Sequence, residues 1–263
     1  MAENTFESKQ ATEAARPRKK KLNFWQRNPG LRSPLGLVVP LILLVLLISA
    51  VNPIFLSSRN LFNVYRQIAI YLVLGTGMTI VIGARGIDLS VGSTVALSAC
   101  VTGLILKKSG VPFEVPVAIA GGVLSGALVG AINGGFIALL KVPPLITTLG
   151  TLTAVRGAAY LVMGPNQVRN FPKSFGSLTR GEILGLPVAG LVATAILLSC
   201  VFLLNYTGFG RRVLALGGNR SAAVRAGIRV WRYEFGAYVL CGALAGFAGV
   251  MLASRLDAAQ AVL

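Results

Sequence analysis

The chain has 263 residues, of which 54% are hydrophobic and only 13% are charged. Soluble domains carry about 25% charged residues, so this composition excludes an ordinary water-soluble globular surface. The formal net charge is +17, with 25 lysines and arginines against eight acidic residues. The basic residues lie in short segments between apolar stretches, a distribution typical of membrane topology, and we therefore expect no nucleic-acid partner.

The sequence offers little material for catalysis. It contains no histidine, few acidic residues and no GxxxxGK[ST] phosphate loop. The three cysteines, Cys100, Cys200 and Cys241, lie in apolar stretches without metal-ligand spacing. The sequence thus shows no pair of nucleophile and base and no route to ATP hydrolysis on this chain. We expect a protein that is not an enzyme and has no catalytic residue, metal site or cofactor.

The N-terminal residues 1–33 are polar, with eight basic residues against three glutamates. The first apolar run begins near Leu35, which is too late for a cleavable signal peptide, and the run is too long for one. We therefore predict a disordered cytoplasmic tail that faces anionic membrane lipid, followed by a retained first helix.

Seven apolar stretches follow the tail, and each is long enough, or nearly so, to cross a hydrocarbon core about 30 Å thick. They cover residues 35–56, 61–82, 91–107, 115–140, 145–163, 184–205 and 234–253. The fourth is the longest, so we expect it to be tilted or broken. The sequence predicts an all-α, polytopic transmembrane helical bundle over residues 34–263.

The distribution of arginine and lysine gives an orientation. The loop 206–233 carries six arginines and no acidic residue, and with seven alternating spans it falls on the same side as the basic tail. Because basic segments stay in the cytoplasm, we predict a multi-pass membrane protein with a cytoplasmic N-terminus.

Two spans carry glycines at every fourth position. Gly122, Gly126, Gly130 and Gly134 form one such row, and Gly242 and Gly246 form another. Small residues on one face let helix backbones approach closely in lipid. We expect ordinary helix packing here, with a subunit interface as the alternative.

Three polar segments stand out between the spans, and the first is residues 83–92. Asp88 is the only acidic residue between Glu13 and Glu114, and Arg85 lies close enough in sequence to pair with it. Ser90 or Asp88 could also cap the helix that begins near Val91. Two readings remain open: a structural turn with a helix cap, or a turn that lines or gates a pathway.

The second segment, residues 141–150, contains paired prolines, which cannot continue a helix but suit its first turn. We expect a sharp reversal or a broken helix, and broken helices often build transporter sites. The polar residues nearby are Asn133, Thr147, Thr148 and Arg156, and each is more often a hydrogen-bond partner between helices than a substrate ligand.

The third segment lies within the arginine-rich loop. Asn219 is a good N-cap, residues 220–226 favour a helix, and Gly227 is a good stop. A short, capped helix with a small-residue face suits docking into a groove of a soluble partner.

In combination and in this order, the three segments resemble the permease subunits of ABC importers for ribose and related monosaccharides. Residues 86–92 match a Gly-Ile-Asp-Leu-Ser-Val-Gly stretch of that family, residues 141–150 match a Lys, Pro and Thr-Leu-Gly stretch, and residues 209–219 match a Phe-Gly loop that leads into Gly-Gly-Asn. The resemblance runs from about Leu61 to Gln260.

The resemblance implies a second permease subunit, identical or different, two cytoplasmic ATPase subunits and a periplasmic sugar-binding protein as partners. It implies that the ATPase binds a coupling loop, formed here by Gly217, Gly218, Asn219, Arg220, Ala223, Arg225 and Gly227. We name as pathway or gating candidates Asp88, Ser90, Gly92, Asn133, Pro143, Pro144, Thr147 and Thr148.

Family members continue for about ten spans, so we expect this chain to be truncated at its C-terminal end. Two alternatives remain for the function. One is an ABC permease for another small solute, such as a nucleoside, a signalling sugar or a branched-chain amino acid. The other is an ion-coupled secondary transporter that uses Asp88.

Overall fold

The computed structural model describes residues 29–107 and 113–261. Most of the predicted basic tail therefore lies outside the described residues. The chain divides into two units, residues 1–57 and residues 58–263. In the first unit, helix α3 (Pro29–Val51) precedes a 3-10 turn, η1 (Pro53–Leu56). Asn52 caps that turn, because its side chain accepts a hydrogen bond from the Ile54 N–H at 3.0 Å.

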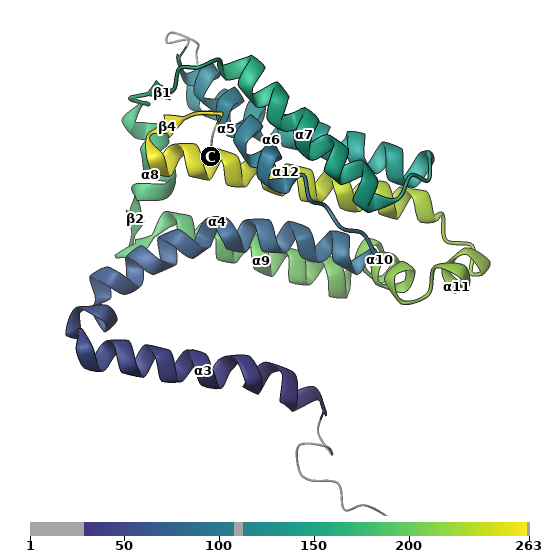
Figure 1. The fold of residues 1–263 in the computed structure, drawn as a ribbon, viewed down its shortest axis with the longest axis horizontal. Helices are drawn as coiled ribbons and strands as arrows, with labels where there is room; N and C mark the ends of the chain where they lie inside the picture. Colours follow the sequence, from purple (N-terminus) through teal and green to yellow (C-terminus); the bar gives the residue numbers. More distant parts are fainter. Residues whose placement is uncertain (1–28, 108–112, 262–263) are drawn as a thin grey trace, which may run out of the picture. The chain divides into compact units, whose positions relative to one another are not determined.

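The second unit is a bundle of helices (Figure 1). Its long helices are α4 (Ser58–Gly83), α5 (Val91–Lys107), α6 (Glu114–Gly134), α7 (Pro144–Met163), α9 (Val188–Tyr206) and α12 (Val230–Leu256). Shorter elements join them: the π-helix η2 (Gly135–Leu139), β1 (Val168–Arg169), α8 (Lys173–Arg180), β2 (Glu182–Ile183), β3 (Leu186–Pro187), α10 (Gly208–Gly218), α11 (Arg220–Arg225) and β4 (Ala258–Ala259).

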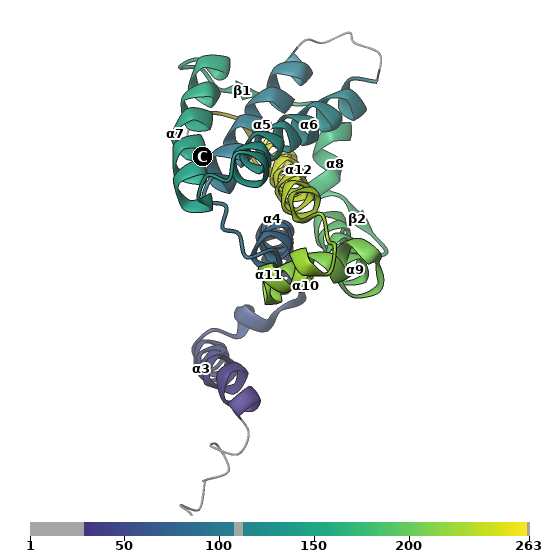
Figure 2. The same ribbon diagram turned by 90° about the vertical axis from the view of Figure 1, so that its right-hand side faces the viewer.

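Helix α12 is the centre of this unit. It packs against α4, α5 and α6, and Figure 2, viewed along the bundle, shows it enclosed between them. The backbones of α12 and α6 are in direct contact, because a Cβ added to Gly126 would lie 2.3 Å from the Gly242 carbonyl oxygen. The two glycine rows predicted from the sequence therefore pack against each other within one chain. Ordinary packing is confirmed, and the alternative of a subunit interface at these glycines is wrong.

The predicted all-α fold is confirmed, and each of the seven predicted spans is helical. Among the described residues, five helices are long and apolar enough to cross a membrane: α4, α6 with η2, α7, α9 and α12. The described apolar part of α3 and the whole of α5 are shorter. The fourth span is one continuous helical segment, Glu114–Leu139, so the expectation of a broken helix is wrong, and a tilt stays a prediction. Its last turn widens into η2, where the Leu140 N–H bonds to the Gly135 carbonyl oxygen at 3.3 Å.

Helix α5 has 17 residues and so spans about 25 Å, less than a hydrocarbon core of about 30 Å. Residues 84–90, which carry no helix, cover the remaining distance between α4 and α5. In Figure 1 this segment runs from the end of α4 back toward the middle of the bundle. Non-helical backbone inside a membrane must be covered by protein or line a water-filled space.

Two small sheets lie at the opposite end of the unit from α10 and α11. Strand β1 pairs antiparallel with β4, placing Val168 opposite Ala259, and β2 pairs with β3 in a tight hairpin. The pairing of β1 with β4 brings the segment after α7 against the segment after α12. Neither of these sheets, nor helices α8 and α10, was predicted from the sequence.

Candidate functional site

The segment 84–90 is held against α12. The Tyr238 hydroxyl donates to the Ile87 carbonyl oxygen at 3.2 Å, and a Cβ added to Gly86 would lie 2.4 Å from the same hydroxyl oxygen. Arg85 adopts the left-handed conformation, with φ of 65°, which turns the chain sharply after α4. The tight backbone that the glycines predicted is thus present.

Asp88 sits at the end of this segment as a buried carboxylate, 2% exposed. Its Oδ1 accepts hydrogen bonds from the Ser90 N–H at 2.9 Å and from the Ser90 hydroxyl at 2.6 Å. The Ser90 carbonyl oxygen then accepts the Thr94 N–H and so starts α5. The structural turn is confirmed, but among the described residues neither the Asp88 nor the Ser90 side chain accepts from an N–H within α5, so the predicted side-chain cap is not formed. A role in lining or gating a pathway stays a prediction.

Asn133 on α6 completes a buried cluster with Asp88 and Ser90. Its Nδ2 donates to the Ser90 hydroxyl oxygen at 2.9 Å and lies 3.4 and 3.5 Å from the two Asp88 carboxylate oxygens. Its Oδ1 is buried and has no hydrogen-bond partner among the described residues. Gly92, by contrast, is exposed, and a Cβ added to it would meet nothing within 4 Å.

Asp88 and Arg85 are separated by the structure. Asp88 is enclosed by Ser90 and Asn133, whereas Arg85 lines a cleft at the end of the unit. The ion pairs found among the described residues do not include this pair, so the expectation that the two would pair is wrong. The backbone turn at Arg85 directs the two side chains to different environments.

The reversal at residues 140–144 is confirmed. Lys141 adopts the left-handed conformation with φ of 58°, and the Val142 N–H bonds to the Phe136 carbonyl oxygen at 3.0 Å. Pro143 precedes α7 and Pro144 is its first residue, where a missing N–H has no cost.

Thr147 and Thr148 are buried in the first turns of α7, but they do not donate to another helix. The Thr147 hydroxyl donates to the Pro143 carbonyl oxygen at 3.2 Å, and the Thr148 hydroxyl donates to the Pro144 carbonyl oxygen at 2.9 Å. The expectation of hydrogen bonds between helices at these two residues is therefore wrong. Their hydroxyls instead donate to the carbonyl oxygens four residues earlier, at Pro143 and Pro144, within the same segment.

The predicted short helix in the arginine-rich loop is α11, and its ends are formed as predicted. The Asn219 side chain accepts from the Ala222 N–H at 3.0 Å. At the other end Gly227, with φ of 79°, donates to Val224 while Ile228 donates to Ala223, which is a Schellman motif. Ala223 is buried, whereas Val224 is 54% exposed. The helix thus seats one face on the chain and presents the other outward.

Two neighbouring glycines at the end of α10, just before α11, lie in different surroundings. A Cβ added to Gly217 would lie 2.0 Å from the Gly83 carbonyl oxygen, so α10 rests directly on the end of α4. A Cβ added to Gly218 would meet nothing within 4 Å. Arg220 adds a polar link, because its guanidinium bonds to the Glu234 carboxylate of α12 at 3.2 and 3.4 Å.

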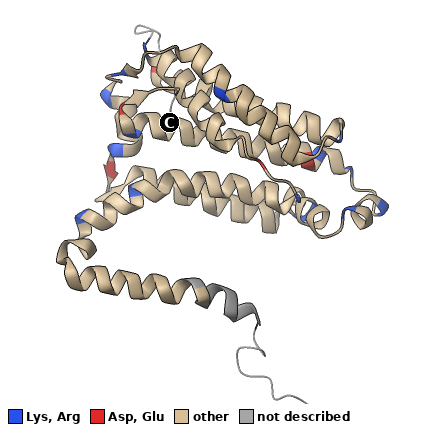
Figure 3. Ribbon diagram, viewed as in Figure 1, with Lys and Arg blue, Asp and Glu red and all other residues tan. Residues whose placement is uncertain are grey.

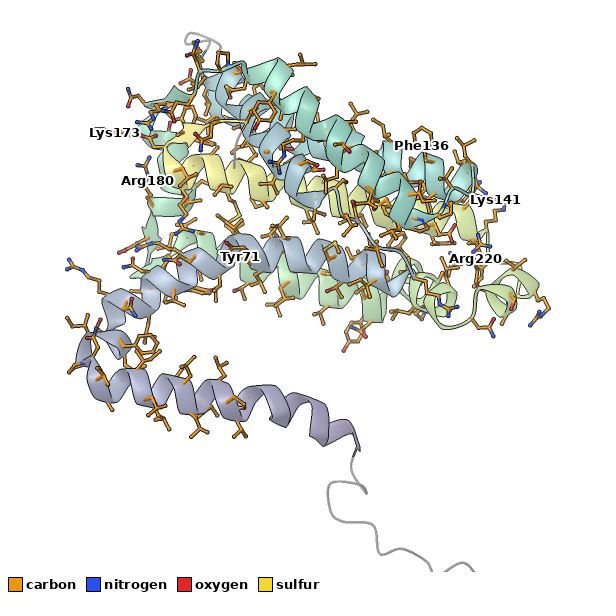
Figure 4. All side chains as sticks on the ribbon, viewed as in Figure 1. Tyr71, Phe136, Lys141, Lys173, Arg180 and Arg220 are labelled. Atoms are coloured by element: carbon orange, nitrogen blue, oxygen red, sulfur yellow. The ribbon has the colours of Figure 1, made fainter. Side chains whose placement is uncertain are left out.

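The three polar segments meet at this end of the unit around one cleft of about 380 Å³. Among its lining residues are Arg85, Lys141, Pro143, Pro144, Arg220 and Glu234. Figure 4 shows the labelled Lys141 and Arg220 at this end, with Lys173 and Arg180 at the opposite end. In residues 58–261, charged residues gather mainly at these two ends, leaving the middle largely uncharged (Figure 3).

Lys141 and Arg220 were each part of a segment predicted from the sequence, but their proximity was not predicted, and Glu234 was not identified as a candidate residue. A signal for it exists: Glu234 is the only acidic residue between Glu182 and Asp257, and it follows directly after the arginine-rich loop. A lone acid beside such a loop indicates a partner for one of the arginines.

Comparison of the sequence with known proteins identifies its family. A family model described as "Branched-chain amino acid transport system / permease component" matches residues 60–262. The chain belongs to this permease family. It is a multi-pass membrane protein, and its matched region contains every element of the second unit except the start of α4.

Several curated relatives are similar over most of the chain. The ribose import permease protein RbsC of Bacillus subtilis is 39% identical over 252 residues, which cover 95% of this chain and 76% of the relative. RbsC of Escherichia coli K12 is 34% identical, with coverage of 85% and 70%, and the D-allose transport system permease protein AlsC of the same strain is 34% identical, with 84% and 67%. No solved structure matches the chain significantly.

Proposed function

We propose that this chain is the permease subunit of an ABC importer that moves a monosaccharide across the bacterial inner membrane. The family assignment and the relatives named for ribose, arabinose and allose support this proposal. In the proposal the chain pairs with a second permease subunit, receives sugar from a periplasmic binding protein, and is driven by two ATPase subunits. The ATPase chains carry out the hydrolysis, and this chain is not an enzyme.

The observation that carries the proposal is the exposed face of α11, which lies beside the cleft lined by Arg85, Lys141 and Arg220. A docking helix must be rigid, must protrude, and must be linked to a membrane span so that motion is transmitted. Helix α11 is capped at both ends, exposes Val224 and Arg225, and is linked to α12 through Arg220 and Glu234. We therefore propose Gly217, Gly218 and residues 219–227 as the ATPase-coupling loop.

The proposed orientation follows from the same end of the unit. Six arginines lie in residues 206–233, which contain α10 and α11, and such a segment stays in the cytoplasm. The end with β1, β4 and the β2–β3 hairpin then faces the periplasm. With alternating spans, the N-terminus is cytoplasmic.

The roles of the remaining candidates follow from their positions. Asp88, Ser90 and Asn133 hold the start of α5 in the interior, where a shift of that helix would move the wall of a pathway. Pro143, Pro144, Thr147 and Thr148 form the start of α7 beside the cleft. We propose that both groups transmit movement from the coupling loop, with Gly92 allowing close approach at the exposed side of α5.

The test is copurification of the ATPase with two matched variants of the full chain. Val224→Asp places a charge on the exposed face of α11, and Leu184→Asp makes the same change at the exposed tip of the β2–β3 hairpin, where Leu184 is 98% exposed. We expect Val224→Asp to lose the ATPase and Leu184→Asp to keep it. Normal recovery of the ATPase with both Val224→Asp and Arg225→Glu would remove the coupling role.

Two other functions are separable by experiment. An ion-coupled transporter that uses Asp88 would lose uptake with an uncoupler and keep it when ATP is depleted, the reverse of our expectation. A different solute is tested by titrating the binding protein with a panel of sugars, nucleosides and amino acids. A relative from Enterobacter sp. strain 638 is named as an autoinducer 2 import permease, so the panel includes that signalling molecule.

A further inference from the structure

Positive charge exceeds negative charge in the cleft of about 380 Å³ at the end of the unit with α11. Its lining includes Arg85, Lys141 and Arg220, whereas Glu234 is the acidic residue among them. Glu234 pairs with Arg220 at distances of 3.2 and 3.4 Å. Within the described residues, Arg85 and Lys141 take part in no ion pair. Two cationic side chains therefore line one cleft without a counter-charge.

Two turns that are distant in the sequence bring these cations together. Arg85, just after α4, has a φ of 65°, and Lys141, just before α7, has a φ of 58°. Residues other than glycine seldom adopt this left-handed conformation. Like charges that line the same cleft repel each other, and an anion bound between them removes that repulsion. The charges therefore indicate an anionic ligand.

The rest of the cleft is largely apolar. Ala84, Ile137 and Leu216 line it as buried side chains. Next to it in the sequence, directly after η2 and in the first turn of α7, Leu140 and Ile146 are 66% and 63% exposed. Because α6 and α7 are long and apolar enough to cross a membrane, we expect these exposed side chains to face lipid. The cleft thus combines cations with an apolar surface at the lipid boundary.

A phospholipid head group matches both properties. Its phosphodiester accepts charge-assisted hydrogen bonds from guanidinium and ammonium groups, and its glycerol and first acyl carbons suit apolar walls. A small inorganic anion would leave those walls in contact with water. Basic pockets between spans at the cytoplasmic surface bind anionic lipid head groups, and the proposed orientation puts this end of the unit at that surface.

The proposed ATPase-binding face lies to one side of this cleft. Val224 and Arg225 line a neighbouring cleft of about 540 Å³, which Lys141 does not line. Arg85 and Arg220 line both clefts and so mark the boundary between them. The two surfaces are therefore adjacent and distinct, one built on α11 and the other on the reversal before α7.

From this arrangement we infer that the cleft binds the head group of an anionic phospholipid, with the phosphate held by Arg85 and Lys141 and the glycerol against the apolar wall. The bound lipid joins the segment after α4 to the reversal before α7, at the proposed coupling end. The inference goes beyond the proposed function, because lipid binding needs neither the sugar nor the ATPase.

The first test measures the dissociation constant of the first lipid bound to the full chain, purified in detergent, by native mass spectrometry. Dioleoyl phosphatidylglycerol is the anionic probe, and dioleoyl phosphatidylcholine, with the same acyl chains, is the zwitterionic control. We expect phosphatidylglycerol to bind about tenfold more tightly, and Arg85→Gln and Lys141→Gln each to weaken its binding about fivefold. Arg229→Gln removes an exposed cation near the same end that does not line the cleft, and it should leave the affinity unchanged. Equal affinity in the parent and both cleft variants, or equal affinity for the two lipids, would overturn the inference.

The second test predicts a gain of binding, which a misfolded variant would not show. Glu234→Gln removes the carboxylate that neutralises Arg220, so we expect phosphatidylglycerol to bind about fivefold more tightly. Unchanged or weaker binding in this variant contradicts the inference. The soluble head group alone, glycerophosphoglycerol, should not displace the lipid at equal concentration. Displacement by it would show a site for a free phosphodiester and overturn the assignment to a lipid.

The alternative occupant is an acidic segment of the ATPase, and copurification separates it from a lipid. We expect Arg85→Gln and Lys141→Gln to retain the ATPase, whereas Val224→Asp loses it. If both glutamine variants lose the ATPase and keep the parent's affinity for phosphatidylglycerol, the cleft binds the protein and the inference is overturned. Lipid binding is measured without sugar or ATPase, so a parent chain that supports no sugar uptake would remove the proposed function alone.

Discussion

The two ends of the second unit differ in the charge of the side chains that line them. At the end with α11, arginines and a lysine surround a cleft, and a short helix protrudes from it. At the end with β1 and β4, uncharged amides and a tyrosine line a larger cavity. The first surface suits binding to a protein, because charge orients two proteins as they meet. Each end can therefore be broken by changes that leave the other intact.

The largest expected effect comes from a substitution that destabilises the whole bundle and therefore disrupts both ends. Gly126→Leu puts a side chain into the seam where α6 and α12 backbones touch, and a Cβ at Gly126 would already lie 2.3 Å from the Gly242 oxygen. Because overpacking against backbone cannot relax through side chains, we expect a loss of about 3 kcal/mol or more and little folded protein in the membrane. Gly157→Leu is the control, since a Cβ there meets nothing within 4 Å. Folded yield after detergent extraction, measured by size-exclusion chromatography, decides the comparison.

The second prediction breaks only the end with α11. Gly217→Ala places a methyl group 2.0 Å from the Gly83 oxygen, so α10 must lift from α4, whereas Gly218→Ala adds the same methyl group in open space. We expect Gly217→Ala to cost about 1–3 kcal/mol in stability and to weaken ATPase copurification. We expect Gly218→Ala to retain both properties. Similar behaviour of the two adjacent variants would show that the seating of α10 does not matter for coupling.

The third prediction concerns the interior between the two ends. Asp88→Asn keeps the shape of the side chain but replaces the carboxylate, whose Oδ1 accepts two hydrogen bonds from Ser90, with a neutral amide. Loss of charge-assisted hydrogen bonds costs about 1.5–3 kcal/mol, so we expect a lower unfolding temperature in detergent. We also expect the residual uptake to remain dependent on ATP and insensitive to an uncoupler. Uptake that disappears in Asp88→Asn while its stability is unchanged would instead support an ion-coupled mechanism.

How far the sequence could predict the molecule also differs between the two ends. The caps of α11 follow from local rules, because Asn219 and Gly227 act on backbone groups within four or five residues. The long helices were likewise predictable from the length and hydrophobicity of their segments. These features depend on neighbours in sequence, and such signals can be read without a structure.

The cavity at the other end was not predicted, because it depends on neighbours in space. Gln167 and Gln260 are brought together by two-residue strands that carry almost no hydrophobic pattern. The pairing of Asp88 with Arg85 failed for the same reason: proximity in sequence was taken for contact, while the left-handed turn at Arg85 separates the two side chains. Helix α10 was missed because its glycines, Gly208, Gly210, Gly217 and Gly218, lower helix propensity, although Gly210 and Gly217 permit close backbone contacts.

The smallest expected effect compares two ion pairs of the same chemistry, one at each end. Arg220 pairs with Glu234 beside α11, and Arg66 pairs with Glu182 at the end with the hairpin. Each pair has one partly buried member, with a side-chain exposure of 13% at Glu234 and 24% at Arg66, and one member that is more than half exposed. Such pairs contribute on the order of 1 kcal/mol, so neither Arg220→Gln nor Arg66→Gln should unfold the protein. Only Arg220 joins the proposed docking helix to α12, so Arg220→Gln should lower the amount of sugar transported per ATP hydrolysed, and Arg66→Gln should not.

The measurement is the ratio of uptake to ATP hydrolysis in proteoliposomes that contain the whole transporter. A double-mutant cycle with Arg220→Gln and Glu234→Gln then isolates the contribution of the pair, since the double variant should be no worse than either single variant. If the ratio falls equally in Arg66→Gln, the loss belongs to the charge of the molecule as a whole. The link between α11 and α12 would then have no special part in transmission, and the contrast between the two ends would be one of composition alone.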